Sequence, residues 1–535
     1  MTQAAGGRRA ADGSITRPLA RSGPAPQAAA HVEPVALLGV GAGIPSLRLQ
    51  LEDLAAAWGG PGRGGVAVCD DDEDTFTLAW SAATAAMSAA GVVPEDMSGL
   101  WWGTSRPPMA EGPSHAFLAA ALGLSATSAG LLASGSPSSG MDALFAAWDA
   151  VASSHASLAL VVASDALVPG TGTAGEAATG AGAAAFVLAS PSVAARSGGP
   201  PALLVFRATR SLPALDRYRP DAGTATGDTY DGRLFREKVF VPLATGVASL
   251  LAGGGPAGTP LSLSDPDGKL AAPCARRLGR TLVSSEARRT LGDTGSASAF
   301  LGAMSALAEP GCLAVVGYGG GRASGLTVEL ARPVPGAAAA ATAIAGASSG
   351  ARVASYTQVL RARGQLEAMG DPVPMAVPPG SAAFVRGNAE MLALQGARCA
   401  RCGTISTPPS IHPVCSGCGS GPLETVTLSR EGTVQTFVVN HTMPAPFQAP
   451  LPLIVIDLDD GARVMLQGTS ADAGALAIGD RVHLVLRRYA IDRGVPVYGY
   501  KALRAQPSAP GERAGPGHEA EGRPSVGSLV EEARQ

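Results

Sequence analysis

Four of the chain's seven cysteines form two CxxC pairs separated by twelve residues, in the stretch CARCGTISTPPSIHPVCSGC. These cysteines are Cys399, Cys402, Cys415 and Cys418. Two pairs of thiolates at this spacing fit the tetrahedral geometry of one Zn²⁺ ion, and the tight turns are suited by Pro408, Pro409 and Gly417. Four thiolates close the coordination shell. We therefore predict a metal that holds the fold and does no chemistry, with iron as the less favoured alternative to zinc.

The other three cysteines stand singly, unlike the cysteines of a secreted, disulfide-linked chain. Cys69 precedes the acidic run DDDED, whose carboxylates should raise the pKa of the thiol. Cys274 and Cys312 lie in apolar surroundings that make a thiol inert. The start of the chain lacks the apolar segment of a signal peptide, and no stretch of about 18 apolar residues would span a membrane. We therefore expect a cytoplasmic protein with no membrane partner.

Composition divides the 535 residues into folded parts and Pro/Gly-rich or polar connections. The segments PVPGAAAAATAIAGASSG and GDPVPMAVPPGS bracket a linker that carries a possible short helix. The predicted parts are a disordered arm at 1–33, an α/β domain at 34–334, a linker at 335–384, a metal ribbon at 385–424, a β domain at 425–505 and a disordered tail at 506–535.

The α/β domain alternates between apolar strands and Ala-rich helices. In its first half the pattern predicts strands at 34–45, 99–105, 156–167 and 182–190 and helices at 75–91 and 114–124. The pattern then begins again, with strands at 260–266, 312–321 and 325–331 and a helix at 297–311. This repeat predicts duplicated βαβ layers with halves at about 34–190 and 202–334, which present their loops and helix N-termini at one shared, ligand-binding edge.

Alternating strand patterns follow the cysteine ribbon, at 432–441, 451–469, 480–490 and 495–505. About five such strands predict a β-barrel of the OB type. An OB barrel that binds single-stranded nucleic acid needs a basic groove with stacking aromatics, but this region has one lysine, Lys501, and few aromatics. The formal net charge of the whole chain is −3, so we expect no nucleic-acid partner.

The α/β domain resembles the 3-hydroxy-3-methylglutaryl-CoA synthase branch of the thiolase superfamily in several collinear blocks. Its first half carries DEDTFTLAWSAATAAMSAAG, WWGTSRPPMAEGPSHAFLAAALGL, SGSPSSGMDALFAAWDAV and LALVVASDALVPGTGTAGEAATGAGAAAFVLA. Its second half carries SDPDGKLAAPCARRLGR, LGDTGSASAFLGAMSALAEPG and VVGYGGGRASG. The resemblance implies a thiolase-like fold, a thioester of CoA or of an acyl carrier protein as substrate, and a homodimer.

Residues 385–505 resemble the acyl-CoA-associated zinc-ribbon and OB-fold domain. The similar segments are MLALQGARCARCGTISTPP, LSREGTVQTFVV and VPVYGYKALRA. The resemblance implies a rubredoxin-like zinc ribbon followed by an OB barrel. As a separate subunit or as a fusion, that family pairs with thiolase-like proteins, covers their active site and helps to handle the CoA substrate. Both parts of the chain therefore imply an association with acyl thioesters.

The thiolase-like family implies a nucleophilic Cys at the N-terminus of a buried helix, a His and an Asn from the second half, and a Glu from the first. Counting back from GMDAL places Pro137 at the Cys position. At the His, Asn and Glu positions stand Ser264 of SDPDG, Asp293 of GDTG and Ser105 of GTSRPP. All four catalytic positions therefore depart from the family pattern, and no acyl-cysteine is expected.

Serines surround the vacant nucleophile position. They are Ser136, Ser138 and Ser139. Ser138 could accept an acyl group if a base stood close. Alternatively, these serines could simply cap the helix. His115, at a predicted helix start, and His412, inside the ribbon, are expected to have surface or supporting roles.

Tyr318 is the other chemical candidate, because its segment GYGGG resembles the Gly-rich active-site loop of the superfamily. Its phenol could transfer a proton in carbon–carbon bond formation or cleavage, with Ser264 or Asp293, or it could be a packed side chain bonded to backbone. The following residues Gly319, Gly320 and Gly321 would let backbone amides approach a thioester oxygen.

Two functions remain open from the sequence. The leading hypothesis is an acyl-thioester enzyme, either a condensing acyltransferase or a retro-aldol-like carbon–carbon lyase, which works without an acyl-cysteine. The alternative is a non-catalytic scaffold that binds acyl-CoA or an acyl carrier protein and supports a partner enzyme. A thioester ordered near Tyr318 would favour the first hypothesis, and an occluded pocket would favour the second.

Overall fold

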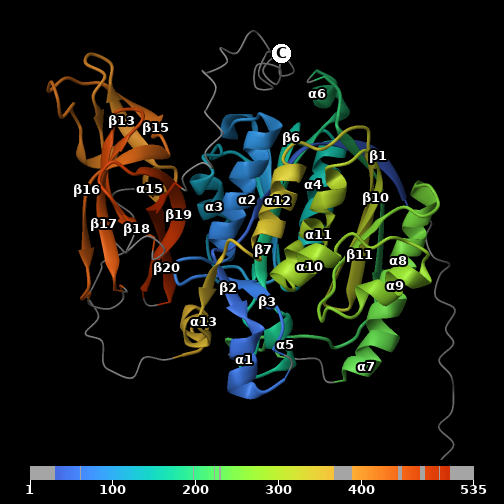
Figure 1. Ribbon diagram of the computed structural model, residues 1–535. Helices are drawn as coiled ribbons and strands as arrows, with labels where there is room; N and C mark the ends of the chain where they lie inside the picture. The colour runs from blue at the N-terminus through green and yellow to red at the C-terminus, as the bar shows by residue number, and fades with distance from the viewer. Residues whose placement is uncertain are drawn as a thin grey trace, which may run out of the picture.

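The computed structural model has a mixed α/β domain beside a smaller β domain, at the right and the left of Figure 1. It describes residues 30–60, 62–196, 198–221, 223–227, 231–366, 388–443, 447, 449–469, 476–492 and 494–505. The arm predicted at 1–33 lies outside the described residues up to position 29, and the tail predicted at 506–535 lies wholly outside them. Within the described ranges, no helix is long and apolar enough to cross a membrane.

Nine strands of the α/β domain form one sheet in the order β5-β4-β6-β7-β1-β8-β11-β10-β9. The first half supplies β1 (Ala30–Gly43), β4 (Gly99–Thr104), β5 (Ala129–Ser134), β6 (Leu158–Ala166) and β7 (Ala181–Ala189). The second half supplies β8 (Ala202–Ser211), β9 (Leu261–Leu263), β10 (Gly311–Gly319) and β11 (Arg322–Leu330). Antiparallel pairing of β1 with β8 joins the two predicted halves into one sheet.

Helices cover both faces of this sheet (Figure 1). The outer face of the first half packs on α2 (Thr75–Ala90) and α3 (Ser114–Ala121). Between the halves lie α4 (Ser139–Ala152) and α11 (Ser298–Leu307). The outer face of the second half packs on α8 (Val241–Leu251) and α9 (Ala271–Arg277). Because the sheet is covered on both faces, its central strands are almost continuously apolar, and the layered fold class predicted from the sequence is confirmed.

Shorter elements connect these layers. They are α1 (Leu51–Trp58), η1 (Pro94–Asp96), α5 (Ala174–Ala178), α6 (Pro191–Arg196), α7 (Gly232–Leu234), η2 (Phe235–Phe240), η3 (Ala252–Gly254), α10 (Ser285–Leu291) and η4 (Gly295–Ala297).

The segment at 335–384, predicted as a linker with a possible short helix, contains a short helix but is more ordered than predicted over its described part, up to residue 366. It forms α12 (Ala337–Gly346), β12 (Arg352–Ala354) and α13 (Tyr356–Ala362). β12 pairs in parallel with β2 (Leu47–Gln50), which also pairs with β3 (Gly65–Val68). The alanine run is a good helix former and buries Ala337, Ala340 and Ile344 against the domain, so composition alone misrepresented it as a connection.

The cysteine segment forms a small ribbon built from α15 (Asn388–Leu392), β13 (Gln395–Cys399), β14 (Ile405–Ser406), η5 (Pro409–Ile411) and β15 (Leu423–Thr427). Five further strands close into a barrel in the order β16-β17-β18-β20-β19. Their bounds are β16 (Glu431–Asn440), β17 (Leu451–Leu458), β18 (Arg463–Gly468), β19 (Arg481–Asp492) and β20 (Val495–Arg504). The predicted ribbon and OB barrel are confirmed.

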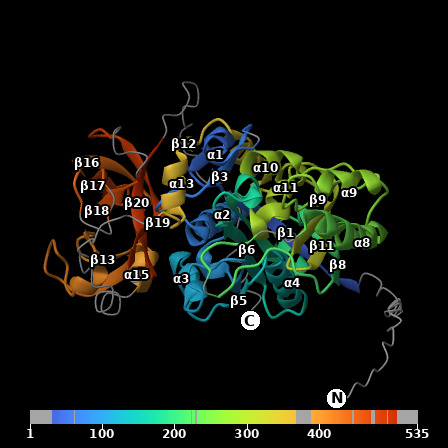
Figure 2. The same ribbon diagram turned by 90° about the horizontal axis from the view of Figure 1, so that it is seen from below.

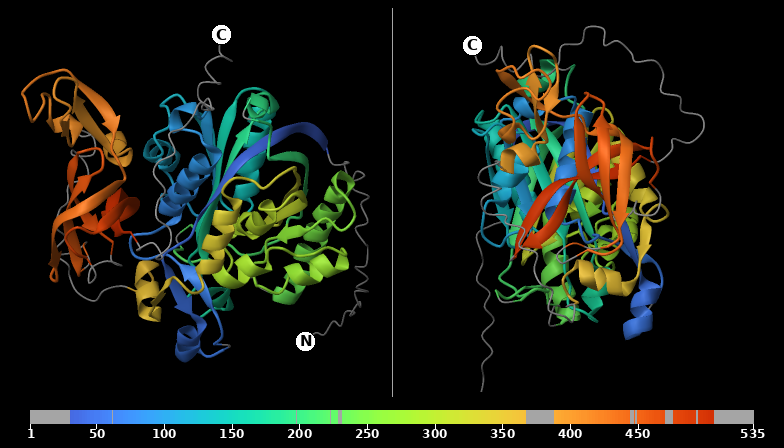
Figure 3. Two further views of the ribbon diagram at one scale, coloured as in Figure 1. Left: turned by 45° about the horizontal axis from the view of Figure 1, so that its top comes forward. Right: turned by 90° about the vertical axis from the view of Figure 1, so that its left-hand side faces the viewer.

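The barrel docks against α2 through aromatic side chains. The right-hand view of Figure 3 shows the barrel in front of the α/β domain. Phe76 of α2 stacks on Tyr498 of β20 with ring centroids 4.1 Å apart, and Trp80 meets Tyr500 edge-on at 5.8 Å. Arg430 lies over the Trp80 ring at 4.8 Å. These contacts are fully or largely buried, so the two domains share one continuous apolar core.

The acidic run DDDED binds the barrel at the same interface. Lys501 pairs with Asp72 at 2.9 Å, Arg487 pairs with Glu73 at 3.1 Å, and the Tyr498 hydroxyl donates to Asp74 at 2.7 Å. Figure 2 shows α13 between the barrel and the α/β domain, so α13 is also part of this interface. The run is therefore a docking surface within the chain, a role that sequence reasoning did not foresee.

Candidate functional site

A cavity of about 310 Å³ lies at the start of α4, where the sequence predicts the family's nucleophile position. Ser136, Pro137 and Gly320 form its floor, and Ser105 and Arg106 follow the end of β4 at its side. The loops come from both halves of the sheet, so the shared edge expected from the βαβ pattern does carry a cavity.

The amides beside Pro137 are already occupied. The Ser138 amide donates to Ser136 Oγ at 3.2 Å, and the Ser139 amide donates to the Ser136 carbonyl at 3.0 Å. Proline itself has neither an N–H nor a nucleophilic atom. The Gly-rich loop packs closely here, since a Cβ on Gly319 would lie 2.5 Å from the Ser138 nitrogen. Pro137 therefore offers the cavity neither a thiol nor an N–H, and the two amides that follow it are bonded to Ser136.

Ser138 stands in a short chain of hydrogen bonds. Its hydroxyl is 2.8 Å from Ser136 Oγ and donates to Asp142 Oδ2 at 3.2 Å. Asp142 is itself paired with Arg322 at 2.9 Å. The chain of contacts thus ends at a neutralised carboxylate rather than at a free base, and Ser136 rather than Ser138 lines the cavity.

Tyr318 lies behind the Gly-rich loop. Its hydroxyl donates to Asp216 Oδ2 at 2.8 Å, and the Gly321 amide donates to the same oxygen at 3.1 Å. Its ring packs edge-on against Phe235 and Phe240 in the layer below α8. Burial, and then the charge of Asp216, raises the pKa of Tyr318 far above the usual range. The phenol is 4% exposed and points at Asp216, so the structure places it beside the cavity wall and not on it.

Asp293 and Ser264 are also set back from the cavity. Asp293 Oδ2 pairs with Arg217 at 3.1 Å, and its Oδ1 accepts from the Gly295 amide at 3.2 Å. Arg217 also donates to the Pro266 carbonyl at 2.7 Å. Ser264 is 3% exposed, and its amide donates to the Val316 carbonyl. Of the predicted catalytic and loop residues, only Gly320 lines the cavity, and Asp293 reaches its wall through Arg217.

Three arginines line the cavity, and sequence reasoning missed all of them. They are Arg106, Arg217 and Arg219. Arg106 is the least satisfied, because its Nη1 is buried without a hydrogen-bond partner among the described residues. Burial, with Arg219 nearby, lowers the pKa of Arg106, and the Asp165 carboxylate opposes that shift. In the sequence these arginines lie in two proline-containing segments, SRPP and RYRP, and the first directly follows a predicted strand. That position is the sequence signal that could have indicated them.

The lone cysteines are poor nucleophiles, as predicted. Burial raises the pKa of Cys69 well above its normal value, and Glu73 and Asp74 add to the rise. Burial likewise raises the pKa of Cys274 to about 11 and shifts that of Cys312 upward. Two histidines have supporting contacts only: His115 bonds to the Leu100 carbonyl and His412 to the Thr407 carbonyl.

The four ribbon cysteines come together as one cluster. Their sulfurs all lie within 4.8 Å of one another, with Cys399 and Cys418 3.7 Å apart and Cys402 and Cys415 3.5 Å apart. Each CxxC pair is followed by a glycine with positive φ, Gly403 at 76° and Gly419 at 70°, which a side chain would strain. Four soft thiolate donors in this arrangement could bind a metal such as zinc.

Both parts of the chain are similar to known proteins. Residues 425–487 match the family model described as the C-terminal OB-fold domain of ChsH2. A DUF35 domain-containing scaffold protein of Methanocaldococcus jannaschii is 37% identical over 117 residues, which are 21% of this chain and 82% of that protein. Through this part, the chain belongs to the DUF35 family.

The α/β domain of this DUF35 protein is similar to hydroxymethylglutaryl-CoA synthases. The enzyme of Methanopyrus kandleri is 28% identical over 314 residues, 55% of this chain and 86% of that one. A solved structure of MvaS in complex with 3-hydroxy-3-methylglutaryl coenzyme A superposes with a TM-score of 0.53 at 21% identity, covering 64% of this chain and 94% of that one. The curacin pathway HMG synthase in complex with acetyl donor-ACP gives 0.52 at 18% identity, covering 66% and 95%. The first part of the chain therefore has the thiolase-like fold seen in hydroxymethylglutaryl-CoA synthases, fused to a DUF35 domain.

Proposed function

We propose that this protein binds an acyl thioester of CoA or of an acyl carrier protein in the cavity at the start of α4 and acts as a non-covalent scaffold for a partner enzyme. The observation that carries the proposal is Pro137. It removes the nucleophile and one amide from the floor of the cavity, and the amides of Ser138 and Ser139 are bonded to Ser136. A thioester held there meets no group that would take its acyl chain.

Binding of a thioester is supported by the cavity's charge and by the relatives. Arg219 adds positive charge beside the Arg217–Asp293 pair, which suits the phosphates of CoA or of a phosphopantetheine arm. Related structures with the same fold were solved with CoA, with 3-hydroxy-3-methylglutaryl coenzyme A and with donor-ACP. A relative of the DUF35 part is named a scaffold protein.

A second candidate keeps the chain an enzyme, and one observation favours it. The Tyr318 hydroxyl is hydrogen bonded to Asp216 directly behind the Gly-rich loop, at residues Gly319, Gly320 and Gly321. A neutral phenol on a carboxylate can donate a proton in a carbon–carbon lyase reaction without any acyl-enzyme. This candidate requires the phenol to reach the cavity when a ligand binds, together with a rearrangement of Asp293 or Ser264.

The test combines binding, mass and turnover on the full chain. We expect acetyl-CoA to bind in calorimetry, to leave the intact mass unchanged, and to be recovered without hydrolysis or transfer. Ser136→Trp should fill the cavity and abolish binding, whereas Ser125→Trp, at an exposed position, should not. An acyl adduct, or equal binding by Ser136→Trp, would overturn the proposal. Turnover of a 3-hydroxyacyl thioester that falls about 10²-fold in Tyr318→Phe would establish the second candidate instead.

Three further expectations remain proposals. Zinc is proposed as the ion held by Cys399, Cys402, Cys415 and Cys418. A homodimer is proposed because β5 lies at the edge of the sheet with its side chains exposed or half-buried, which leaves one edge free to pair with a second copy. A cytoplasmic location is proposed from the unpaired cysteines.

A further inference from the structure

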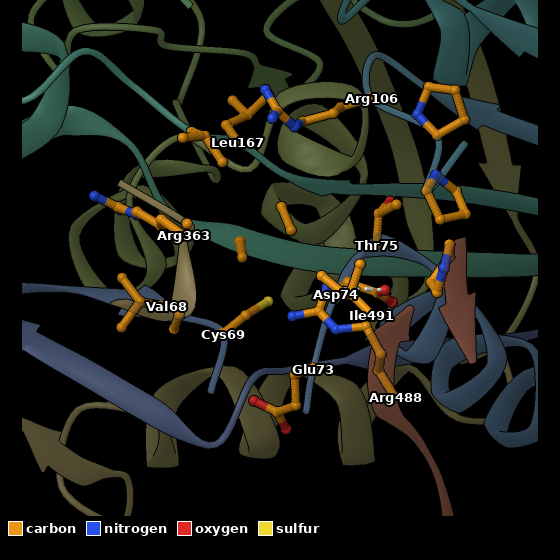
Figure 4. Close-up of a pocket in the computed structure, with 18 of the residues that line it drawn as sticks. Val68, Cys69, Glu73, Asp74, Thr75, Arg106, Leu167, Arg363, Arg488 and Ile491 are labelled. Atoms are coloured by element: carbon orange, nitrogen blue, oxygen red, sulfur yellow. Dashed lines mark hydrogen bonds and ion pairs between the residues drawn. The ribbon is translucent and has the colours of Figure 1, made fainter. Parts of the chain in front are cut away.

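A second cavity, of about 250 Å³, lies between the α/β domain and the OB barrel. Figure 4 shows side chains from both domains around it, with Cys69, Thr75 and Arg106 from the α/β domain and Arg488 and Ile491 from the barrel. Arg363, which follows α13, closes another side. The barrel supplies part of the cavity wall through Arg488, Ile491 and Pro496.

This interdomain chamber adjoins the cavity at the start of α4. Arg106 and Leu167 line both spaces, and Val168 of the chamber is next in sequence to Pro169 of the other cavity. A ligand that enters past Arg219 to the floor at Pro137 therefore has the chamber ahead of it, on the far side of Arg106 and Leu167.

We infer that the interdomain chamber receives the acyl group of the bound thioester, and that Ile491 of the OB barrel sets the length of acyl chain it accepts. This inference rests on the proposed function and adds a substrate class to it, namely thioesters of short, uncharged acyl chains. The two cavities then divide the ligand, with its thioester at the α4 floor and its hydrocarbon between the domains.

Apart from Arg106, the arginines around the chamber are paired within the protein. Arg363 pairs with Glu176 at 3.4 Å, and Arg488 donates to the Asp71 carbonyl at 2.8 Å and lies 3.5 Å from Asp74. The Cys69 thiol points toward the middle of the space and is a neutral group there. What remains for a ligand is a wall of small and apolar residues such as Val68, Leu167, Ile491 and Pro496, which suits hydrocarbon rather than a second ionic group.

Arg106 fits the junction between the two spaces. Its buried Nη1 lacks a hydrogen-bond partner among the described residues, and a thioester carbonyl at the junction would accept a bond from it. The volume of the chamber falls below the roughly 300–1,000 Å³ of pockets for drug-sized ligands, so it suits a short acyl chain. Ile491 is 50% exposed and lies where the barrel forms the wall, so substitution there changes the chamber without opening the core.

The experiment measures binding of acetyl-, butyryl-, hexanoyl- and octanoyl-CoA to the full chain by calorimetry. In the natural protein, affinity should rise about four-fold per methylene until the chamber is full. Ile491→Trp should end the rise at a shorter chain and leave acetyl-CoA unchanged, and Ile491→Ala should extend it. Ile478→Trp is the control, since Ile478 is exposed on the same barrel and lines neither cavity.

The outcomes separate this inference from the proposed function. If acetyl-CoA does not bind the natural chain, the proposed function fails, and this inference fails with it. If all esters bind but both Ile491 variants follow the same length dependence as the natural protein, only the inference is overturned. The same holds if Ile478→Trp shifts the length dependence as much as Ile491→Trp does. Opposite shifts in the Trp and Ala variants, with an unchanged control, support it.

Discussion

Substitution of Asp74 tests whether the acidic run both starts α2 and docks the barrel. Asp74 Oδ1 accepts from the amides of Phe76 and Thr77 at 3.0 Å each, which caps the helix. Its Oδ2 accepts from the Tyr498 hydroxyl at 2.7 Å across the domain interface. Asp74→Ala removes the cap, at a cost of about 1 kcal/mol, and leaves a nearly buried phenol without its acceptor, at a cost of about 1–3 kcal/mol. We therefore expect Asp74→Ala to lower the free energy of unfolding by about 2–4 kcal/mol.

The matched variant Asp74→Asn separates hydrogen bonding from charge. Asparagine caps a helix as well as aspartate does, and its amide can donate to the Tyr498 oxygen, so the loss should stay below about 1 kcal/mol. Asp231→Ala is the control for a cap alone, because Asp231 accepts the same pair of amide bonds at the exposed start of α7.

The assay is amide hydrogen exchange on the full chain, because it resolves barrel and helix separately where a single unfolding midpoint would not. Protection should fall in both α2 and β20 in Asp74→Ala. A loss below about 1 kcal/mol, or an equal loss in Asp74→Asn, would refute the double role assigned to this carboxylate.

Three other substitutions test the remaining sites. Cys402→Ser should retain less than about half an equivalent of metal and should unfold the ribbon, whereas the control Cys312→Ser should keep its metal. Elemental analysis measures the metal content of both variants. A full equivalent of metal in folded Cys402→Ser would contradict the proposed site. Because of Tyr318, the protein should become less stable as the pH rises above about 10. In the unfolded chain the tyrosine ionises near pH 10, whereas in the folded protein burial raises its pKa. The stability that this side chain contributes is therefore present below pH 10 and is lost above it. Urea unfolding at pH 8 and 11 should show a smaller loss in Tyr318→Phe than in the natural chain, because burial also raises the pKa of Tyr489, Tyr498 and Tyr500, which remain in the variant. Leu131→Asp on β5 should give a monomer in light scattering and Leu215→Asp should not, and a natural chain that is already monomeric at micromolar concentration counts against the dimer.

The sequence was sufficient for the elements whose signals are local. The helix at 75–91 begins at the Asp74 cap and ends at Gly91, which has φ 66°, so both boundaries were visible in the sequence. β5 was missed because it is an exposed edge strand whose apolar run AGLLA is short and lies between the Ser-containing segments SATS and SGSPSS. α12 was misread because Ala-rich composition suits a connection as well as a helix, and only its contacts with the domain distinguish them.

The candidate site was predictable in place and less so in content. Pro137 and Gly320 were located by motif, since both lie in segments whose spacing follows the family. The orientation of Tyr318 toward Asp216 depends on a contact 102 residues apart in sequence, which no local pattern encodes. The arginine lining was missed for the same reason, because Arg217 reaches the cavity from a loop that has no regular structure.

The four altered catalytic positions have a common physical reason, and it predicts the behaviour of Pro137→Cys. If the thiol is absent, an imidazole and an amide in the second half have no nucleophile to activate. At one of those positions Asp293 instead pairs with Arg217 and so holds a cationic side chain on the cavity wall, which serves binding. Pro137→Cys would therefore find neither an imidazole nor an amide side chain to activate it, because Ser264 and Asp293 stand at those positions and are set back from the cavity. We expect this variant to bind acetyl-CoA and to show neither an acyl adduct in peptide mapping nor condensation. A rapid acyl-cysteine at position 137 would mean that the surrounding residues still activate a nucleophile, and the scaffold function would then have to be abandoned for a covalent one.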